Sequence, residues 1–369
     1  MPDAGDYFLE SNYLRKQENY TMKLYINGRF LTQRITGVQR YAIEIVKCLD
    51  ELLDEKDDVT ILIPPEVQVN FLELKRIKQK TVGKFTGHLW IQISLPLFVT
   101  KNGGELLSLS GTAPIFLPGF WTVHDITFIR QPESFDWKFR AVYRMALCLG
   151  LKRCKKIFTV SEFSKNEIVI YFNIPEDRIQ VAYSSANYLL DTEYQTIDVS
   201  KFGVEPQEYY LSVSSRNLHK NQNFIVKLAR KYPEKKFVIV GGQHKSFNSV
   251  TENDTANLIY TGYVSDDELA SLYKFSKGFI FPSIYEGFGL PPLEAIVQEC
   301  RSVALSDISV FREIYDQAYF FDPKDVESFS FEKFNEIDIT EKERKQYIEK
   351  YSFSVAAKIY KNAVESSRK

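Results

Sequence analysis

Cysteine is scarce in this chain, and its few copies are not arranged for a shared task. The four cysteines (Cys48, Cys148, Cys154 and Cys300) are scattered along 369 residues, and no two of them form a C-x-x-C pair. Structural zinc sites and the disulfide frameworks of small secreted domains both depend on closely spaced cysteines. The sequence therefore predicts a protein of a reducing compartment, with neither disulfides nor a zinc site.

Long apolar runs and an excess of one charge are also missing. No stretch approaches the roughly 18 uninterrupted apolar residues of a membrane span, and the N-terminus lacks the apolar core of a signal peptide. The 47 basic and 48 acidic side chains give a formal net charge of −1, so no overall field attracts nucleic acid. We expect a cytoplasmic protein that has no nucleic-acid partner.

What is present is enough chain for two domains, with 44% hydrophobic and 26% charged residues. From Met22 onward apolar strands alternate with helical patterns, which is typical of α/β domains. Periodicity is lost over residues 183–208, where we predict the domain boundary. Phe320 to Pro323 are expected to form a turn. The predicted parts are an N-terminal extension (1–21), two Rossmann-like domains (22–190 and 205–350) and a C-terminal helix that packs back on the first domain (351–369).

One stretch of the second domain joins a strand, a glycine turn and a helix. Phe279 to Phe281 are apolar like a buried parallel strand, and a helix is predicted to start near Leu293. Two carboxylates, Glu286 and Glu294, flank the turn. Its glycines, Gly287 and Gly289, let the backbone approach a ligand, free helix amides favour anionic oxygens, and carboxylates accept hydrogen bonds from sugar hydroxyls. The pattern fits a polyhydroxylated, phosphorylated ligand, and it equally fits an ordinary strand–turn–helix with two solvated acids.

The ordered string P-S-x-x-E-G-F-G-L-P-x-L-E-A, from Pro282 to Ala295, resembles the motif of the retaining nucleotide-sugar glycosyltransferases of family 4. The resemblance implies the GT-B fold, in which two Rossmann-like domains face each other across a cleft. It also implies that Glu286 meets the donor sugar hydroxyls and that Glu294 holds the ribose. The amides of the glycine turn around Gly287, Phe288, Gly289 and Leu290 would then face sugar and phosphate oxygens.

Two features of the first domain extend this interpretation. Gly37 lies in T-G-V-Q-R-Y, between a predicted strand (23–27) and helix (38–53). It is either a plain turn glycine or part of the family's glycine loop, which approaches the donor diphosphate and the acceptor. His124 and Asp125 end an apolar strand, where ligands collect in parallel sheets. The resemblance implies that His124 reaches the donor sugar, whereas Asp125 orients His124 or caps the next turn.

Two cations follow the first strand of the second domain, predicted at Tyr209 to Val213. Arg216 and Lys220 precede the next predicted helix, where positive charges can hold a diphosphate and stabilise the charge it gains on leaving. The alternative is two surface cations. The resemblance, which has Arg and Lys at this spacing, favours the diphosphate, and it implies that the backbone around Tyr263 and Val264 receives the nucleobase.

The predicted activity is that of a retaining hexosyltransferase. It would move a hexose or deoxyhexose, of mannose, rhamnose or glucose type, from a nucleotide diphosphate sugar to a saccharide acceptor. The resemblance implies a lipid-linked acceptor at the cytoplasmic membrane face, in O-antigen or capsule biosynthesis. No D-x-D triplet occurs in the chain, so neither a metal nor another cofactor is expected, and side-chain cations with helix amides would hold the diphosphate. A nucleotide-sugar epimerase of GT-B architecture and a non-catalytic sugar-nucleotide-binding relative remain as alternatives.

A basic, acid-free segment runs from Lys138 to Lys156. Its lysines and arginines are interleaved with apolar side chains. An anionic membrane surface would attract such a helix, so peripheral membrane contact is one interpretation. A buried crossover helix with basic ends is the other, and the sequence does not separate them.

Overall fold

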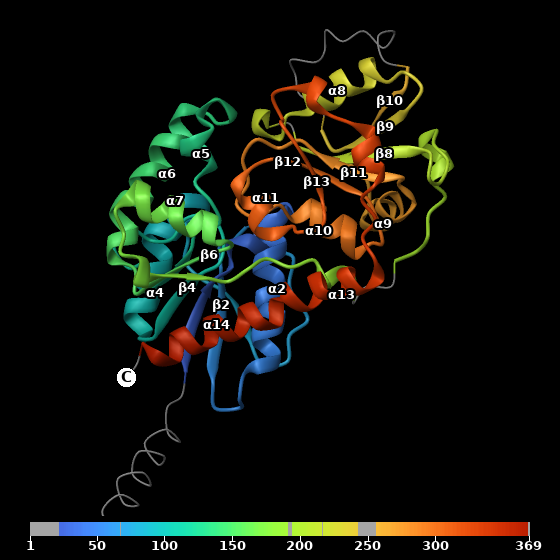
Figure 1. Cartoon of the computed structure of the whole chain (residues 1–369). Helices are drawn as coiled ribbons and strands as arrows, with labels where there is room; N and C mark the ends of the chain where they lie inside the picture. The colour runs from blue at the N-terminus through green and yellow to red at the C-terminus, as the bar shows by residue number, and fades with distance from the viewer. Residues whose placement is uncertain (1–21, 67, 191–193, 216, 243–255, 368–369) are drawn as a thin grey trace, which may run out of the picture.

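The computed structural model describes residues 22–66, 68–190, 194–215, 217–242 and 256–367. Within these residues the chain forms two α/β units, each built on a parallel sheet, and the two units lie side by side (Figure 1). Several predicted site residues follow strand ends in both sheets, so the arrangement of the two sheets positions the site.

The first sheet has the strand order β3-β2-β1-β4-β5-β6-β7, and all pairings between its strands are parallel. Its inner strands are apolar and buried because helices cover both faces of the sheet. The strands are β1 (Lys23–Asn27), β2 (Asp58–Ile63), β3 (Lys78–Thr81), β4 (Glu105–Ser108), β5 (Phe120–Thr122), β6 (Lys156–Thr159) and β7 (Ile179–Val181).

The helices of this unit begin with α2 (Gly37–Leu52), which Thr36 and Gln39 start as a capping box. Tyr41, Ile45 and Leu49 lie on its buried face. Ser161 caps the start of α7, because its hydroxyl accepts a hydrogen bond from the Ser164 amide. The remaining helices are α3 (Gly87–Leu89), α4 (Leu95–Asn102), α5 (Thr127–Arg130), α6 (Trp137–Gly150) and α7 (Glu162–Phe172).

The second sheet has the order β10-β9-β8-β11-β12-β13, again with parallel pairings between its strands. Its strands are β8 (Tyr209–Val213), β9 (Lys236–Val240), β10 (Leu258–Gly262), β11 (Gly278–Phe281), β12 (Val303–Ser306) and β13 (Tyr319–Phe321). Its helices are α8 (Gln222–Lys231), α9 (Asp266–Phe275), α10 (Leu290–Val297), α11 (Ser309–Ile314), α12 (Phe331–Asn335) and α13 (Glu341–Lys350).

Two local predictions show where sequence patterns succeed and fail. The strand at Tyr209–Val213 is confirmed with the predicted bounds. The turn predicted from Phe320 to Pro323 is wrong, because Tyr319–Phe321 forms the edge strand β13. Three residues are too few to show a period, and the following D-P pair drew the prediction toward a turn.

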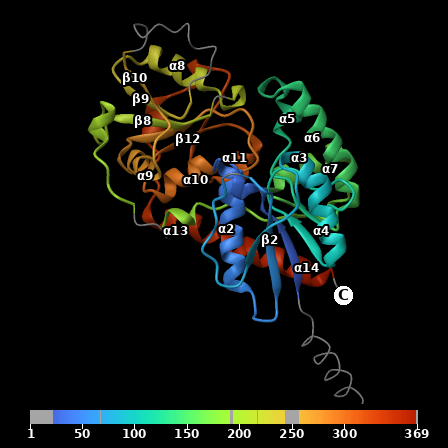
Figure 2. The ribbon, with the colours of Figure 1, turned by 180° about the vertical axis from the view of Figure 1, so that it is seen from behind.

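The last helix, α14 (Phe353–Ser366), packs against α2 of the first unit and crosses one face of that unit, in front of it in Figure 1 and behind it in Figure 2. Tyr360 is fully buried there. Its hydroxyl is 2.9 Å from the Tyr41 hydroxyl and 2.8 Å from Thr122 Oγ1, and Tyr41 in turn donates to the Ala182 carbonyl at 2.9 Å. One side chain near the C-terminus thus joins α2, β5 and the end of the first sheet.

We predict that Tyr360→Ala destabilises the protein by about 3–5 kcal/mol, because it empties a fully buried aromatic site. Tyr360→Phe should cost only about 1 kcal/mol, since it removes hydrogen bonds and keeps the ring. Urea denaturation followed by circular dichroism measures both. Lys358→Ala, an exposed change on the same helix, is the control, and a Tyr360→Ala midpoint equal to that of the control would contradict the assigned role.

Candidate functional site

The turn between β11 and α10 is built on glycines that have no room for a side chain. Gly289 precedes α10 with a φ of 89°, and a Cβ there would lie 2.5 Å from Phe311 Cε1. Its carbonyl accepts a hydrogen bond from the Tyr315 hydroxyl. The positive φ and the close ring both require glycine. Pro291 and Pro292 in the first turn of α10 carry no N–H, so the backbone N–H groups at this end of the helix are those of Gly289 and Leu290.

Gly287 is the point where the second unit presses on the first. A Cβ on Gly287 would lie 2.7 Å from the carbonyl oxygen of His124 and 3.0 Å from Asp125 Cβ. The Gly287 carbonyl accepts hydrogen bonds from two buried hydroxyls, Ser161 Oγ at 2.6 Å and Ser164 Oγ at 3.1 Å. Both serines belong to the start of α7, so this contact fixes the glycine turn against the predicted His-Asp pair.

Glu286 and Lys220, predicted from separate motifs, form an ion pair. The distance from Lys220 Nζ to Glu286 Oε1 is 2.6 Å, and the side chains are 19% and 12% exposed. Lys220 Nζ also lies 5.4 Å from the centre of the Phe281 ring. The structure therefore brings a carboxylate and an ammonium together at the carboxyl ends of β8 and β11, still accessible to a ligand.

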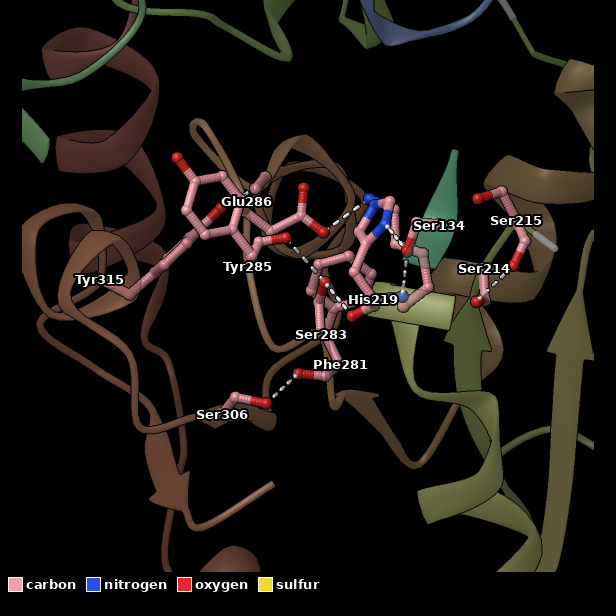
Figure 3. A network of polar contacts seen from close by, with 12 residues as sticks. Ser134, Ser214, Ser215, His219, Phe281, Ser283, Tyr285, Glu286, Ser306 and Tyr315 are labelled. Carbon is pink, nitrogen blue, oxygen red and sulfur yellow. Dashed lines mark hydrogen bonds and ion pairs between the residues drawn. The ribbon is translucent and has the colours of Figure 1, made fainter. Parts of the chain in front are cut away.

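His219, beside Lys220, is buried between the two units (Figure 3). Its backbone amide and Nδ1 lie 3.2 and 3.1 Å from Ser134 Oγ of the first unit, and its ring stacks on Phe135. Its carbonyl accepts from the Ile284 amide at 2.8 Å. Burial, with Lys220 next to it, lowers the pKa of His219 to about 4. His219 is thus a neutral contact between the two units.

Glu294 lies on α10 and is buried. Its two carboxylate oxygens accept hydrogen bonds from the hydroxyls of Tyr188, at 2.5 Å, and Tyr273, at 2.9 Å. Burial raises the pKa of Glu294, while the two tyrosines and Arg40 act in the opposite direction. Arg40 lies 4.9 Å from the centre of the Tyr188 ring and pairs with Asp266 at 3.0 Å. Both oxygens of the carboxylate predicted to hold the ribose therefore already accept hydrogen bonds from tyrosine hydroxyls.

His124 faces the same region from the first sheet. Its Nε2 lies 2.9 Å from the Leu109 carbonyl, and its ring meets Tyr41 edge-on at 4.9 Å. Burial lowers the pKa of His124. Because a carbonyl only accepts, Nε2 carries the proton and Nδ1 of the neutral ring is left as an acceptor. Asp125 caps the following turn by accepting from the Thr127 amide at 2.7 Å, which decides between its two predicted roles.

The other predicted residues are placed as follows. Gly37 and Leu290 stand at the starts of two helices from different units, and a Cβ on Gly37 would lie 3.8 Å from Leu290 Cδ2. Phe288 is buried against Tyr183 and Tyr351. Tyr263 is 64% exposed and lies 3.8 Å from the Arg34 guanidinium, next to the partly buried Val264. Arg216 lies outside the described residues, and the functional roles of all these residues remain predictions.

Sequence reasoning missed the tyrosines that bind Glu294 and the serines that bind Gly287. Tyr188 lies in the aperiodic connecting segment and Ser164 is a single polar residue within α7, so neither carries a pattern that points to its partner. A signal existed only for Ser161, a serine that directly precedes a helix and can cap it. Its second partner, the Gly287 carbonyl, is 126 residues away along the chain.

Comparison with known proteins agrees with this geometry. The family model for glycosyl transferases group 1 matches residues 195–352, which contain the ion pair and Glu294. Over these residues the chain is similar to the group 1 glycosyl transferases. The predicted family resemblance and the activity of a glycosyltransferase are thereby confirmed.

Individual relatives agree with this assignment. The chain is 27% identical over 317 residues to the O-antigen chain mannosyltransferase RfbU of Salmonella typhimurium, covering 80% of this chain and 85% of that relative. It is 30% identical over 223 residues to the O-antigen chain mannosyltransferase B of Escherichia coli, covering 57% of this chain and 58% of that protein. A glycosyltransferase structure from Rickettsia africae superposes with a TM-score of 0.69 at 18% identity, over 95% of this chain and 100% of that one. The predicted GT-B fold is confirmed.

No described helix is both long and apolar enough to cross a membrane. No group of three or more His, Cys, Asp or Glu side chains in the described ranges is placed to hold a metal ion. The expectation that the reaction needs no metal remains a prediction.

We predict that Gly287→Ala destabilises the contact between the two units by about 1–3 kcal/mol, because its methyl group would meet the first unit's backbone. Gly37→Ala is the matched control, since its Cβ would make only ordinary contact with Leu290. Thermal denaturation compares the two variants with the wild type. Equal midpoints for Gly287→Ala and Gly37→Ala would contradict the close approach.

We also predict that His219 makes stability fall with acid. The unfolded chain binds a proton near a pKa of about 6.5, whereas the folded chain resists protonation down to about 4. The contribution of His219 to the free energy of unfolding is therefore fully present above the unfolded-state pKa. It declines by about 3 kcal/mol as the pH falls to the folded-state pKa. Unfolding of wild type and His219→Gln between these pH values measures the difference. Parallel pH profiles would contradict the burial of a neutral imidazole.

Proposed function

We propose that this glycosyltransferase moves a hexose or deoxyhexose from a nucleotide diphosphate sugar to a saccharide acceptor, with mannose as the first sugar to test. The supporting observation is the Lys220–Glu286 pair, held beside the start of α10 and against the His124 segment of the first unit. A cation, a sugar-binding carboxylate and free helix amides converge there from separate segments of the chain.

The donor parts match the groups around the turn. A diphosphate would take Lys220 and the amides of Gly289 and Leu290 at the start of α10, because both favour anionic oxygens. Glu286, released from Lys220, would accept hydrogen bonds from the sugar hydroxyls, and Nδ1 of His124 would accept another. Glu294 would exchange a tyrosine hydroxyl for a ribose hydroxyl. The backbone at Tyr263 and Val264, with Gly37 opposite, completes the proposed donor site.

The transfer is proposed to retain the anomeric configuration without a metal or another cofactor. The bond from the anomeric carbon to the leaving phosphate oxygen breaks while a bond to the acceptor hydroxyl oxygen forms on the same face. The hydroxyl proton passes to the leaving phosphate. Lys220 would stabilise the negative charge that the diphosphate gains, which is the electrostatic term that such a site supplies.

The biological setting is proposed from the relatives. The two relatives described above are named as mannosyltransferases of O-antigen chains. We propose that this chain acts in surface-polysaccharide biosynthesis, on a saccharide that is lipid-linked at the cytoplasmic face of the membrane. The acceptor would approach from the first unit, which lies opposite the donor groups.

The deciding experiment compares GDP, UDP and dTDP sugars side by side. Thermal stabilisation identifies the nucleotide, and release of free nucleotide with and without a lipid-linked acceptor then identifies the activity. Acceptor-dependent release from a mannosyl donor supports the proposal. Interconversion of the donor without release would indicate an epimerase, and stabilisation without turnover on any donor would indicate a binding protein.

We predict that Lys220→Ala lowers kcat at least 100-fold, because the leaving diphosphate loses its positive partner; removing one such electrostatic group costs about 10²–10³ in rate. Lys227→Ala, an exposed lysine on α8, is the matched control and should leave kcat unchanged. Circular dichroism checks that both variants fold. Near-normal turnover of Lys220→Ala would remove the diphosphate assignment.

A further inference from the structure

Helix α6 has apolar side chains on the face that points to solvent. Four large ones are exposed: Trp137 at 67%, Val142 at 44%, Met145 at 52% and Leu149 at 43%. They fall on one side of the helix, given its turn of 3.6 residues. A helix that covers a sheet normally turns its polar side outward, so these residues on the outer face of α6 call for a partner.

The opposite face of α6 already accounts for the packing of the helix. Ala146, Leu147 and Gly150 are buried. A Cβ on Gly150 would lie 2.7 Å from the Trp121 ring, so the helix sits as close to the sheet as it can. The sequence left open that this segment is a buried crossover helix. The inner face of α6 packs as such a helix would, but this packing does not explain the apolar residues on the outer face.

The charges on this face have one sign. Lys138, Arg144, Lys152 and Arg153 are exposed, and no acidic residue occurs from Trp137 to Ser161. The nearest acid before the helix, Asp136, is engaged as its N-cap, accepting from the Lys138 amide at 2.8 Å. Beyond the end of the helix, Phe116 is 82% exposed, with the Arg153 guanidinium 5.6 Å from its ring centre. Apolar groups bordered by cations match an anionic lipid surface in both polarity and charge.

We propose that the outer face of α6, with Phe116, docks this glycosyltransferase on an anionic lipid bilayer. The apolar side chains would enter the interface between headgroups and acyl chains, and the cations would meet the lipid phosphates. Figures 1 and 2 both show α6 on the outer side of the first unit, away from the second. Trp137, Val142, Met145 and Leu149 are exposed with both units in place, so the second unit does not cover this surface.

The position of α6 connects this surface to the site. The segment before the helix contacts the second unit where Ser134 meets His219, next to Lys220. A bilayer on α6 would hold a lipid-linked saccharide at the unit from which the acceptor is proposed to enter. This last step rests on the proposed function, whereas docking itself does not, so the two can fail separately.

The test is sedimentation of the full chain with vesicles of phosphatidylcholine alone or mixed with phosphatidylglycerol. Binding is expected only with the anionic lipid and should weaken with added salt. Lys138→Ala with Arg144→Ala should weaken it about 25-fold, taking about fivefold for each charge. Trp137→Ser with Met145→Ser should weaken it about tenfold or more, since inserted apolar area is lost.

The control exchanges the same residue types on a helix of the other unit, with Lys227→Ala and Arg230→Ala on α8, both exposed. It should bind vesicles like the wild type. All variants should keep the melting temperature and the thermal shift with nucleotide sugars, which separates docking from the donor site. The proposal would be overturned if the protein bound both vesicle types equally, or if the α6 variants bound like the control. It would also be overturned if light scattering showed a dimer that the Trp137→Ser and Met145→Ser changes dissociate.

Discussion

The close contact of Gly287 with the backbone of His124 and Asp125 is the constraint on which the site depends. There is no space for one more carbon atom, and the Gly287 carbonyl is held by two buried serine hydroxyls of α7. Separating a buried carbonyl from such partners costs free energy unless water molecules take their place. The two units therefore have a preferred distance, and Glu286, the residue directly before Gly287, is held close to the segment that follows β5.

The two carboxylates of the site already have partners in this structure. Lys220 neutralises Glu286, and the tyrosine hydroxyls of positions 188 and 273 satisfy Glu294. An unpaired buried carboxylate would be costly. A donor that carries phosphates and hydroxyl groups can replace these partners one for one. Binding would then exchange hydrogen bonds and charges instead of stripping water from bare ions, so selectivity would come from how well the new partners fit.

The sequence predicted the framework better than the contacts between its parts. Strands such as Tyr209–Val213 are continuous apolar runs, and their burial under helices follows from that composition. The ion pair of Glu286 with Lys220 was within reach, because both residues follow strands that end at the same edge of one sheet. The partners of Gly287 and Glu294 were not, since Ser164 of α7 and Tyr188 of the connecting segment are distant along the chain from the residues they contact, and only the docking of the two units brings them close.

The same docking links the proposed ribose site to the first unit. Tyr188, in the connecting segment, donates to Glu294, and Arg40 of α2 lies over its ring while pairing with Asp266 of α9. A ligand that takes the place of the Tyr188 hydroxyl would move the ring beneath Arg40 and so disturb a contact between the units. Such coupling requires that the ligand make different contacts in two states of the protein. In this structure the contact that would change is made by a single tyrosine, Tyr188. Donor binding would consequently be sensed on the side where the acceptor is proposed to enter, without any contact between the two substrates.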